Sequence, residues 1–378
     1  MKIEIRASRL LGLEDNPPAS LTALASEMGL SSYQLRHFLA RTSPQISRAT
    51  LEAVCQYLLR HDRVPAEELF SRLLAIVPDS FWPMVSARQQ INFAVGVRLT
   101  HVKGLEQLVV ADDAVFQSVM VNELTGTAAN APTKAAVGSR HPRQVIDSRL
   151  VQAWEPQGAN DEEVIEEANA FFSRCARTQE NAATICVGSI KSNPACDPFV
   201  ARAFRKAAPF VSEDSVRTAD ERSVPFLMLY RADDPHPPSC WGGRVVAADD
   251  SRNTPGIYFA REPGRWDFLP SNEETDTALV FYCFYKTKQN VEMVWGGYTG
   301  RATRCLAKIL SDGQADCFWP PAIDDERQSV GAFVVQFDFR ETRKKKGISK
   351  MPHETLVGYR VTPLTADVLA PRIARPRK

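Results

Sequence analysis

Two segments in the second half of the chain combine residue types that suit the binding of an anionic group. In residues 183–207, an apolar run leads into Gly188, Ser189, Lys191, Ser192 and Asn193, and a helical pattern follows. Glycine lets a ligand approach the backbone closely, hydroxyl and amide groups donate hydrogen bonds, and a helix N-terminus attracts negative charge. The segment is therefore a candidate cradle for a phosphate or a ribose.

The second segment, residues 290–310, repeats this arrangement with Gly296, Gly297, Thr299, Arg301 and Thr303 between an apolar run and a helical pattern. Neither segment is a Walker loop or a G-x-G-x-x-G fingerprint, so each alone could also be an ordinary strand-to-helix turn. Ligands of α/β sheets bind where strands end at their carboxyl side. We therefore predict that both loops line one pocket, with Lys191 and Arg301 supplying its positive charge.

No stronger catalytic pattern competes with these loops. His236 and Cys240 could form a nucleophile pair or a metal site, but the segment is rich in proline, which favours a structured loop. Asp112 and Asp113 fit the first turn of a helix, where carboxylates offset the dipole. The basic run 343–346 is typical of a solvated hairpin loop, although it could also touch DNA or an anionic ligand. No metal and no cofactor is expected, and the protein is not expected to be an enzyme.

Composition limits the remaining classes. The eight cysteines include no C-x2-C or C-x4-C pair, which favours reduced thiols over zinc ligands or disulfides. No signal-peptide pattern opens the sequence, and no apolar run reaches the roughly 18 residues of a membrane span. A cytoplasmic protein with no membrane partner is expected. Because the net charge is only +1, any argument for nucleic-acid binding must come from local charge.

The chain divides into segments of different pattern. Residues 1–70 read as short helices, and residues 71–126 as a helical connector with amphipathic stretches at 67–76, 87–100 and 112–124. Such an apolar connector would hold a homodimer. Residues 127–160 are rich in Gly, Ala, Pro, Asn and Thr, which predicts a linker with one ordered piece at 145–154. Residues 161–378 form the last segment.

In this last segment, strand patterns alternate with helical ones, which predicts an α/β domain with a mixed sheet and helices on its faces. The expected helices are residues 161–177, 197–207 and 299–310. The expected strands are residues 184–187, 225–231, 256–260, 278–285, 291–295, 332–339 and 355–361. The fold class is therefore multidomain, with an all-α N-terminal part, a helical middle segment and an α/β C-terminal domain.

Residues 21–40, LTALASEMGLSSYQLRHFLA, have the spacing of a helix-turn-helix. Ala25 is small where two helices would cross, and Gly29 can adopt the positive φ that the turn needs. Ser31 or Ser32 can cap the second helix. The apolar residues that would fix the two helices together are Leu24, Met28, Leu30, Leu35 and Phe38.

This segment resembles the lambda-repressor-like (Cro-type) helix-turn-helix domains, and the resemblance extends through ISRATLEAVCQYLLRHDRVPAEELF, about a fifth of the chain. It implies that Ser47 caps a fourth helix that carries Thr50, Leu51, Val54, Cys55 and Leu58, and that Leu69 closes the domain. The repressors with a hinge helix are a second resemblance, because their headpieces share the I-S-x-x-T run, but their hinge does not follow here.

The resemblance also implies that the second helix enters the major groove of DNA. The residues expected to contact DNA are Ser32, Tyr33, Gln34, Arg36, His37, Arg41 and Arg48. Their side chains can hydrogen-bond base edges or phosphates. A generic helical bundle, or a helix-turn-helix that contacts only protein, would show the same spacing.

These observations predict a transcriptional regulator, either repressor or activator. It would bind a double-stranded DNA operator as a homodimer and sense a small anionic or nucleotide-like effector in its C-terminal domain. Two alternatives stay open. One is a nucleotide-processing enzyme, such as a defence effector, that carries a helix-turn-helix for autoregulation or localisation. The other is a protein-interaction module that binds no ligand.

Overall fold

The computed structural model describes residues 2–5, 10–11, 13, 21–39, 47–66, 69, 73–99, 107–130, 144–155, 160–178, 180–252, 254–341 and 354–374. The chain divides into two compact units, residues 1–79 and 80–378. This boundary differs from the expected ones at residues 70, 126 and 160. The predicted connector and linker both contribute elements to the second unit.

The first unit is mainly helical, with one small antiparallel sheet. Its elements are β1 (Lys2–Ile5), α2 (Leu21–Glu27), α3 (Ser32–Leu39), α4 (Arg48–Arg60) and β2 (Leu74–Val77), and β1 pairs with β2. The core lies between the three helices, where Ala25, Leu35, Val54 and Leu58 are fully buried. The small Ala25 allows α2 and α3 to approach closely.

Local capping explains where two of these helices begin. The N–H of Gln34 donates to Ser31 Oγ over 3.2 Å, and Gln34 Oε1 accepts the N–H of Ser31 over 2.9 Å, so the two residues close the start of α3 reciprocally. Gly29 precedes this cap with a φ of 70°, which an L side chain rarely adopts. Ser47 accepts the N–H of Thr50 over 3.1 Å and caps α4. Both caps confirm the predictions made from the sequence.

A nine-stranded mixed sheet forms the centre of the second unit. Its strands are β3 (Gln90–Leu99), β4 (Gln107–Val109), β5 (Val145–Gln152), β6 (Ala182–Val187), β11 (Thr275–Tyr285), β12 (Asn290–Gly297), β13 (Ile323–Asp324), β14 (Gln328–Glu341) and β15 (Glu354–Pro363). Strands β5, β3, β6 and β12 are neighbours in this order and run parallel, and β11, β14 and β15 continue the sheet with antiparallel pairing. The expected α/β architecture with a mixed sheet is confirmed.

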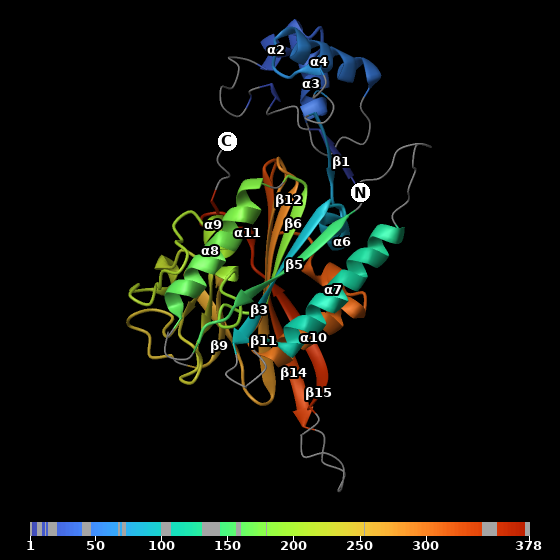
Figure 1. Ribbon diagram of the computed structural model, residues 1–378. Coiled ribbons are helices and arrows are strands. Elements are labelled where there is room, and N and C mark those ends of the chain that lie inside the picture. Colours follow the sequence, from blue (N-terminus) through green and yellow to red (C-terminus); the bar gives the residue numbers. More distant parts are fainter. Residues whose placement is uncertain are drawn as a thin grey trace. The chain divides into compact units, whose positions relative to one another are not determined.

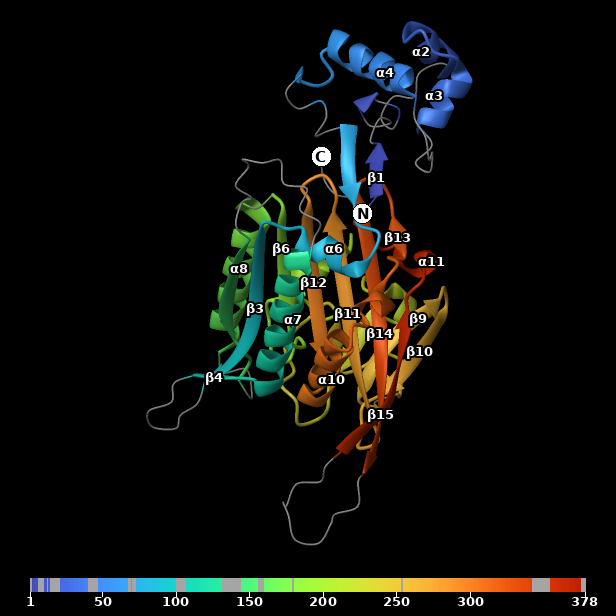
Figure 2. The ribbon, with the colours of Figure 1, turned by 90° about the vertical axis from the view of Figure 1, so that its right-hand side faces the viewer.

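Helices cover both faces of this sheet (Figures 1 and 2). One face carries α8 (Asp161–Thr178), α9 (Cys196–Ala203) and α11 (Ala366–Leu369), and the other carries α6 (Phe81–Ser86), α7 (Ala111–Asn130) and α10 (Gly300–Ser311). Along β11, Leu279, Phe281 and Cys283 belong to the first core, while Val280 and Tyr282 belong to the second. Because successive side chains of a strand point to opposite faces, a strand covered on both sides is apolar throughout.

A second, four-stranded sheet packs against the α9 face of the large sheet. It consists of β7 (Phe226–Leu229), β8 (Gly242–Gly243), β9 (Gly256–Glu262) and β10 (Arg265–Pro270), in the order β10-β9-β7-β8. Two short 3-10 helices complete the unit, η3 (Ala219–Glu221) and η4 (Ala315–Phe318).

The helical prediction for residues 87–100 is wrong, because these residues supply β3 at the centre of the parallel strands. Ile91, Phe93 and Val95 face the α7 core and Ala94 faces the other core, and the polar Asn92 is buried as well, so the run does not show the simple alternation of a half-exposed strand. The prediction for residues 67–76 fails in part, because residues 74–77 form β2. The expected linker contains the end of α7 and all of β5.

Candidate functional site

The two loops singled out from the sequence meet at one edge of the large sheet. Because β6 and β12 are parallel neighbours, the segments that follow them leave the sheet at the same edge. The N–H of Gly188 donates to the carbonyl of Trp295 over 2.9 Å, which ties the two exits together. Between them lies a pocket of about 220 Å³. Its lining is Arg98, Val110, Asp113, Ser189, Lys191, Ser192, Arg231, Asp234, Pro235, Gly297, Tyr298, Thr299, Gly300 and Thr303.

Close backbone packing positions the first loop. A Cβ on Gly96 of β3 would lie 1.8 Å from the carbonyl oxygen of Ser192, so only glycine lets the loop rest on the strand. The fully buried Asn193 then fixes the loop, because its Nδ2 donates to the carbonyls of Ala94 and Val187 over 2.9 Å each. Its Oδ1 accepts the N–H of Ala195 over 3.1 Å. Asn193 therefore joins β3 to β6 and does not line the pocket, contrary to the prediction.

The second loop leads directly into α10. Thr299 accepts the N–H of Arg301 over 3.2 Å as the cap of this helix and donates to Asp276 Oδ2. A Cβ on Gly300 would lie 2.2 Å from Asp112 Oδ2, so the first turns of α7 and α10 are adjacent. The Arg304 guanidinium on α10 also pairs with Asp112 at 2.7 Å. Two helix N-termini, each with positive potential, thus lie at this edge of the sheet.

Three cationic side chains line the pocket, and of the predicted pair they include Lys191 but not Arg301. Lys191 lies 2.9 Å from Asp234 Oδ2 and 3.9 Å above the ring of Tyr298. Burial lowers the pKa of its ammonium, although Asp234 partly opposes this effect. Arg98 and Arg231 are the other two cations. Arg231 is held by Ser271, whose hydroxyl it contacts over 3.0 Å.

Arg301 is not in the pocket lining. Its guanidinium donates to the carbonyls of Asn272 over 2.6 Å and Glu273 over 3.0 Å, and it lies 4.0 Å from the ring centroid of Phe339. It therefore holds the turn that precedes β11, and its predicted role as a pocket cation is wrong. Gly188 and Gly296 allow close packing beside the pocket. A Cβ on Gly296 would lie 3.3 Å from the Trp241 ring, and a Cβ on Gly188 would lie 2.6 Å from Ser192 Oγ.

Asp113 is the most unusual residue of the pocket, and no pattern in the sequence placed it there. Asp113 lies in the first turn of α7, as predicted, but its side chain is only 2% exposed. Its Oδ2 has no hydrogen-bond partner among the described residues. Burial raises the pKa of this carboxyl to about 7, with Asp112 adding to the effect and Thr303 and Arg98 opposing it. A carboxyl group with this pKa can hold or release a proton near neutral pH.

Gly188 leaves room for this carboxyl. Its φ of 104° disfavours an L side chain, and a Cβ would lie 2.8 Å from Asp113 Oδ2 and 2.6 Å from Ser192 Oγ. The sequence shows that β6 is followed by a glycine, but it does not show that Asp113, 75 positions earlier, packs against this glycine. Arg98 and Arg231, the two pocket cations that were not predicted, lie in no local sequence motif.

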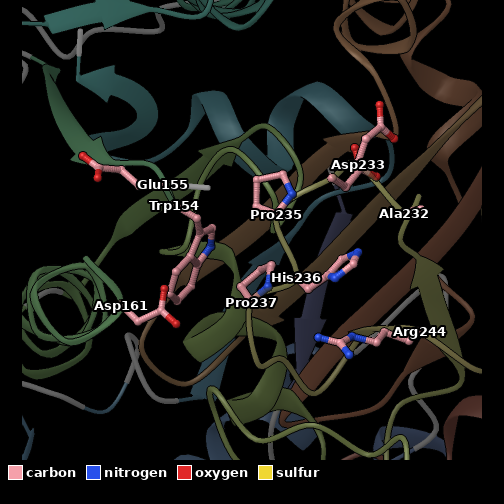
Figure 3. A pocket seen from close by; sticks show the side chains of 10 residues that line it. Trp154, Glu155, Asp161, Ala232, Asp233, Pro235, His236, Pro237 and Arg244 are labelled. Carbon is pink, nitrogen blue, oxygen red and sulfur yellow. The ribbon is translucent and has the colours of Figure 1, made fainter. Parts of the chain in front are cut away.

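A larger groove of about 500 Å³ lies beside the pocket and shares Asp234 and Pro235 with it. Figure 3 shows Trp154, Pro237 and His236 along it, with Asp161 at one end and Arg244 at the other. His236 stacks on Tyr230 with ring centroids 5.7 Å apart, and its Nε2 lies 2.7 Å from the carbonyl oxygen of Arg231. These contacts support the structured loop expected for this segment.

Cys240 is not activated as a nucleophile. Its thiol is buried, and burial together with the Asp197 carboxylate raises its pKa well above the usual value. Asp197 accepts the hydroxyl of Ser239 over 2.5 Å and the N–H of Cys240 over 3.2 Å, so it organises these loops. Within the described residues, no group of three or more His, Cys, Asp or Glu side chains is arranged to hold a metal ion.

The first unit carries a separate candidate surface on α3. Leu35 and Phe38 are buried, whereas Gln34, Arg36 and His37 are exposed and Tyr33 is 76% exposed. Three predicted contact residues have side-chain partners within the unit. Gln34 Oε1 accepts the N–H of Ser31 over 2.9 Å, Ser32 donates to Thr22 over 3.1 Å, and Arg48 pairs with Glu52 at 2.7 Å. Arg41 lies outside the described residues.

Among the described helices, none is long and apolar enough to cross a membrane. Comparisons of the chain with protein-family models, curated proteins and solved structures find no match.

Proposed function

We propose that the protein is a DNA-binding transcriptional regulator whose second unit binds a small anionic ligand. The observation that supports the DNA-binding part most strongly is the arrangement of α2 and α3. They are joined by a turn with Gly29 at positive φ, and α3 buries Leu35 and Phe38 while exposing polar and aromatic side chains. A helix held in this way can enter a major groove with its exposed side chains towards the base edges.

The pocket supports the ligand-binding part. Arg98, Lys191 and Arg231 line it, and the N-termini of α7 and α10 lie at the same edge of the sheet. Positive side chains beside helix N-termini favour phosphate or carboxylate groups. A ligand that binds one conformation of the protein better than another would change its affinity for DNA.

Fluorescence anisotropy with labelled duplexes from the region upstream of the protein's own gene tests the DNA-binding part. The double substitution Tyr33→Ala and Arg36→Ala should weaken specific binding by roughly tenfold or more, because each lost base contact costs about 1–3 kcal/mol. Lys206→Ala, which removes an exposed cation from the second unit, is the matched control. Unchanged affinity of the double variant would refute the assignment of α3.

One observation favours a second candidate, a nucleotide-processing enzyme. Asp113 is buried in the pocket with an unpartnered oxygen and a pKa of about 7, which suits a general base at neutral pH. Phosphorus NMR of nucleotides incubated with the full chain would detect turnover. Product formation that Asp113→Asn abolishes would favour the enzyme over the regulator.

A further inference from the structure

The pocket places an unpaired buried acceptor next to cations. Asp113 Oδ2 is enclosed by the first turn of α7 and the loop after β6, without a hydrogen-bond partner among the described residues. A buried carboxylate that lacks a partner costs free energy unless a ligand supplies the missing hydrogen bond. An ionised carboxylate only accepts hydrogen bonds, so this ligand group must be a donor.

The rest of the lining requires a different group on the same ligand. Arg98, Arg231 and Lys191 bear positive charge, and Lys191 is already paired with Asp234 at 2.9 Å. Ser189 and Thr303 add hydroxyl groups. Arginine and hydroxyl groups beside a helix N-terminus suit phosphate oxygens. The ligand therefore combines an anionic group with a hydrogen-bond donor.

On the basis of the proposed function, we infer that the pocket binds a sugar phosphate, free or as part of a nucleotide. Arg98 and Arg231 contact the phosphate, and Asp113 accepts a hydrogen bond from a sugar hydroxyl. Other charged groups near Asp113 are Asp112 on α7, Arg304 on α10, Lys191 after β6 and Asp234 after β7.

Calorimetry on the full chain at pH 8 would compare ribose 5-phosphate, AMP and methyl phosphate, which carries a phosphate ester without a sugar hydroxyl. Ribose 5-phosphate should bind at least tenfold tighter than methyl phosphate, and AMP shows whether a nucleotide is preferred. Asp113→Ala, which removes both acceptor oxygens, should abolish this preference. Arg98→Ala, at an exposed position, should weaken the binding of ribose 5-phosphate and of methyl phosphate equally.

The preference should also depend on pH. A protonated carboxyl accepts a hydrogen bond more weakly than a carboxylate does, so below pH 7 the preference for ribose 5-phosphate over methyl phosphate should fall, by at most about tenfold per pH unit. The assignment of Asp113 would be overturned if methyl phosphate bound as tightly as ribose 5-phosphate. It would also be overturned if the preference for ribose 5-phosphate grew as the pH falls. If no phosphate binds at all, the proposed ligand-binding role of the unit is itself wrong.

A separate observation concerns β5. Within the described part of the chain, this strand pairs with β3 alone. The N–H of Val145 points towards β3 and donates to the carbonyl of Gln89, and the N–H of Ala153 donates in the same way to the carbonyl of Val97. The N–H of Gln152 points away from β3 and donates to the Glu167 carboxylate. Along a strand, the N–H and C=O groups of successive residues point alternately to one side and to the other. Ile146, Ser148 and Leu150 therefore direct their N–H and C=O groups away from the sheet.

The sequence of β5 is complementary to itself in antiparallel pairing. A two-fold axis at Ser148 places Asp147 opposite Arg149 of the partner subunit, and Arg149 opposite the partner's Asp147. The same register pairs Ile146 with the partner's Leu150, and these are 37% and 46% exposed. Both residues direct their backbone groups outwards, as a hydrogen-bonded antiparallel pair requires. Exposed apolar side chains on an open edge favour pairing with another strand.

We infer that two copies of the chain join through β5 into one continuous sheet, with the axis at Ser148. This places a homodimer contact in the predicted linker, at residues 145–152, and not in the expected helical connector. Such an interface is isologous, because each copy contributes the same strand.

A charge exchange tests this register by analytical ultracentrifugation of the full chain. Asp147→Arg should weaken dimerisation by roughly tenfold or more, because two arginines then oppose each other at both symmetry-related positions. Arg149→Asp should act similarly, and the double variant should recover dimerisation because the opposite charges face each other again. Glu163→Arg, an equal charge change at an exposed position of α8, is the control.

Thermal melting of each variant would confirm that it folds. A monomeric native chain would overturn the inference. So would a dimer that neither single charge change weakens, since its interface would then lie elsewhere.

Discussion

Asn193→Ala should loosen the loop after β6, which contributes Ser189, Lys191 and Ser192 to the lining of the pocket. The amide of Asn193 makes three buried hydrogen bonds of 2.9, 2.9 and 3.1 Å, to the carbonyls of Ala94 and Val187 and from the N–H of Ala195. Removing it leaves three backbone groups with one partner fewer at a fully buried position. An unsatisfied buried group costs about 1–3 kcal/mol. Because the strand carbonyls keep other contacts, we expect the free energy of unfolding to fall by about 3 kcal/mol in total.

Thermal and denaturant unfolding of the full chain measures this loss. Because the unit of residues 80–378 has an unfolding entropy of about 2.1 cal/mol/K per residue, 3 kcal/mol corresponds to a fall in Tm of roughly 5 °C. Ser192→Ala is the matched control, because its hydroxyl makes one longer hydrogen bond, of 3.3 Å, to Ser189. A loss below about 1 kcal/mol for Asn193→Ala, or an equal loss for both variants, would refute the role of Asn193 in joining β3 to β6.

Three further predictions concern other positions. Glu292 is buried on β12, and burial raises the pKa of its carboxyl from 4.5 to about 7. Between these pH values the folded state keeps a proton that the unfolded state releases. The free energy of unfolding should therefore fall as the pH rises from about 4.5 to 7. Urea titrations across this range should show a smaller fall for Glu292→Gln, and an unchanged slope would contradict the buried protonated state. Gly96→Ala should cost about 3 kcal/mol in the same assay, because its Cβ meets the Ser192 carbonyl at 1.8 Å; a neutral effect would refute that packing. Ser47→Ala should destabilise α4 by about 1 kcal/mol, seen as faster hydrogen exchange of its amides, and unchanged exchange would argue against the cap.

The local patterns of the sequence predicted much of the second unit. The strand patterns at 278–285 and 291–295 and the helical pattern at 161–177 correspond to β11, β12 and α8, because each carries a clear apolar period or a β-branched run. The convergence of the two glycine-containing loops was also predicted, since parallel strands end at the same edge of a sheet. The cap at Ser31 was readable because capping depends on neighbouring residues only, whereas the cap at Ser47 was expected from the family resemblance.

Only the tertiary structure decided which side chains face the pocket. Arg301 was placed there by its neighbours in the sequence, yet carbonyl groups at Asn272 and Glu273 bind its guanidinium elsewhere. Asp113 looked like an ordinary first-turn carboxylate, and burial against a loop 75 positions later is what changes its chemistry. Likewise, β3 was read as a helix because a strand buried on both faces has no polar side to reveal its period. Composition and spacing determine local structure, whereas burial, charge environment and the pairing of distant segments depend on how the chain packs.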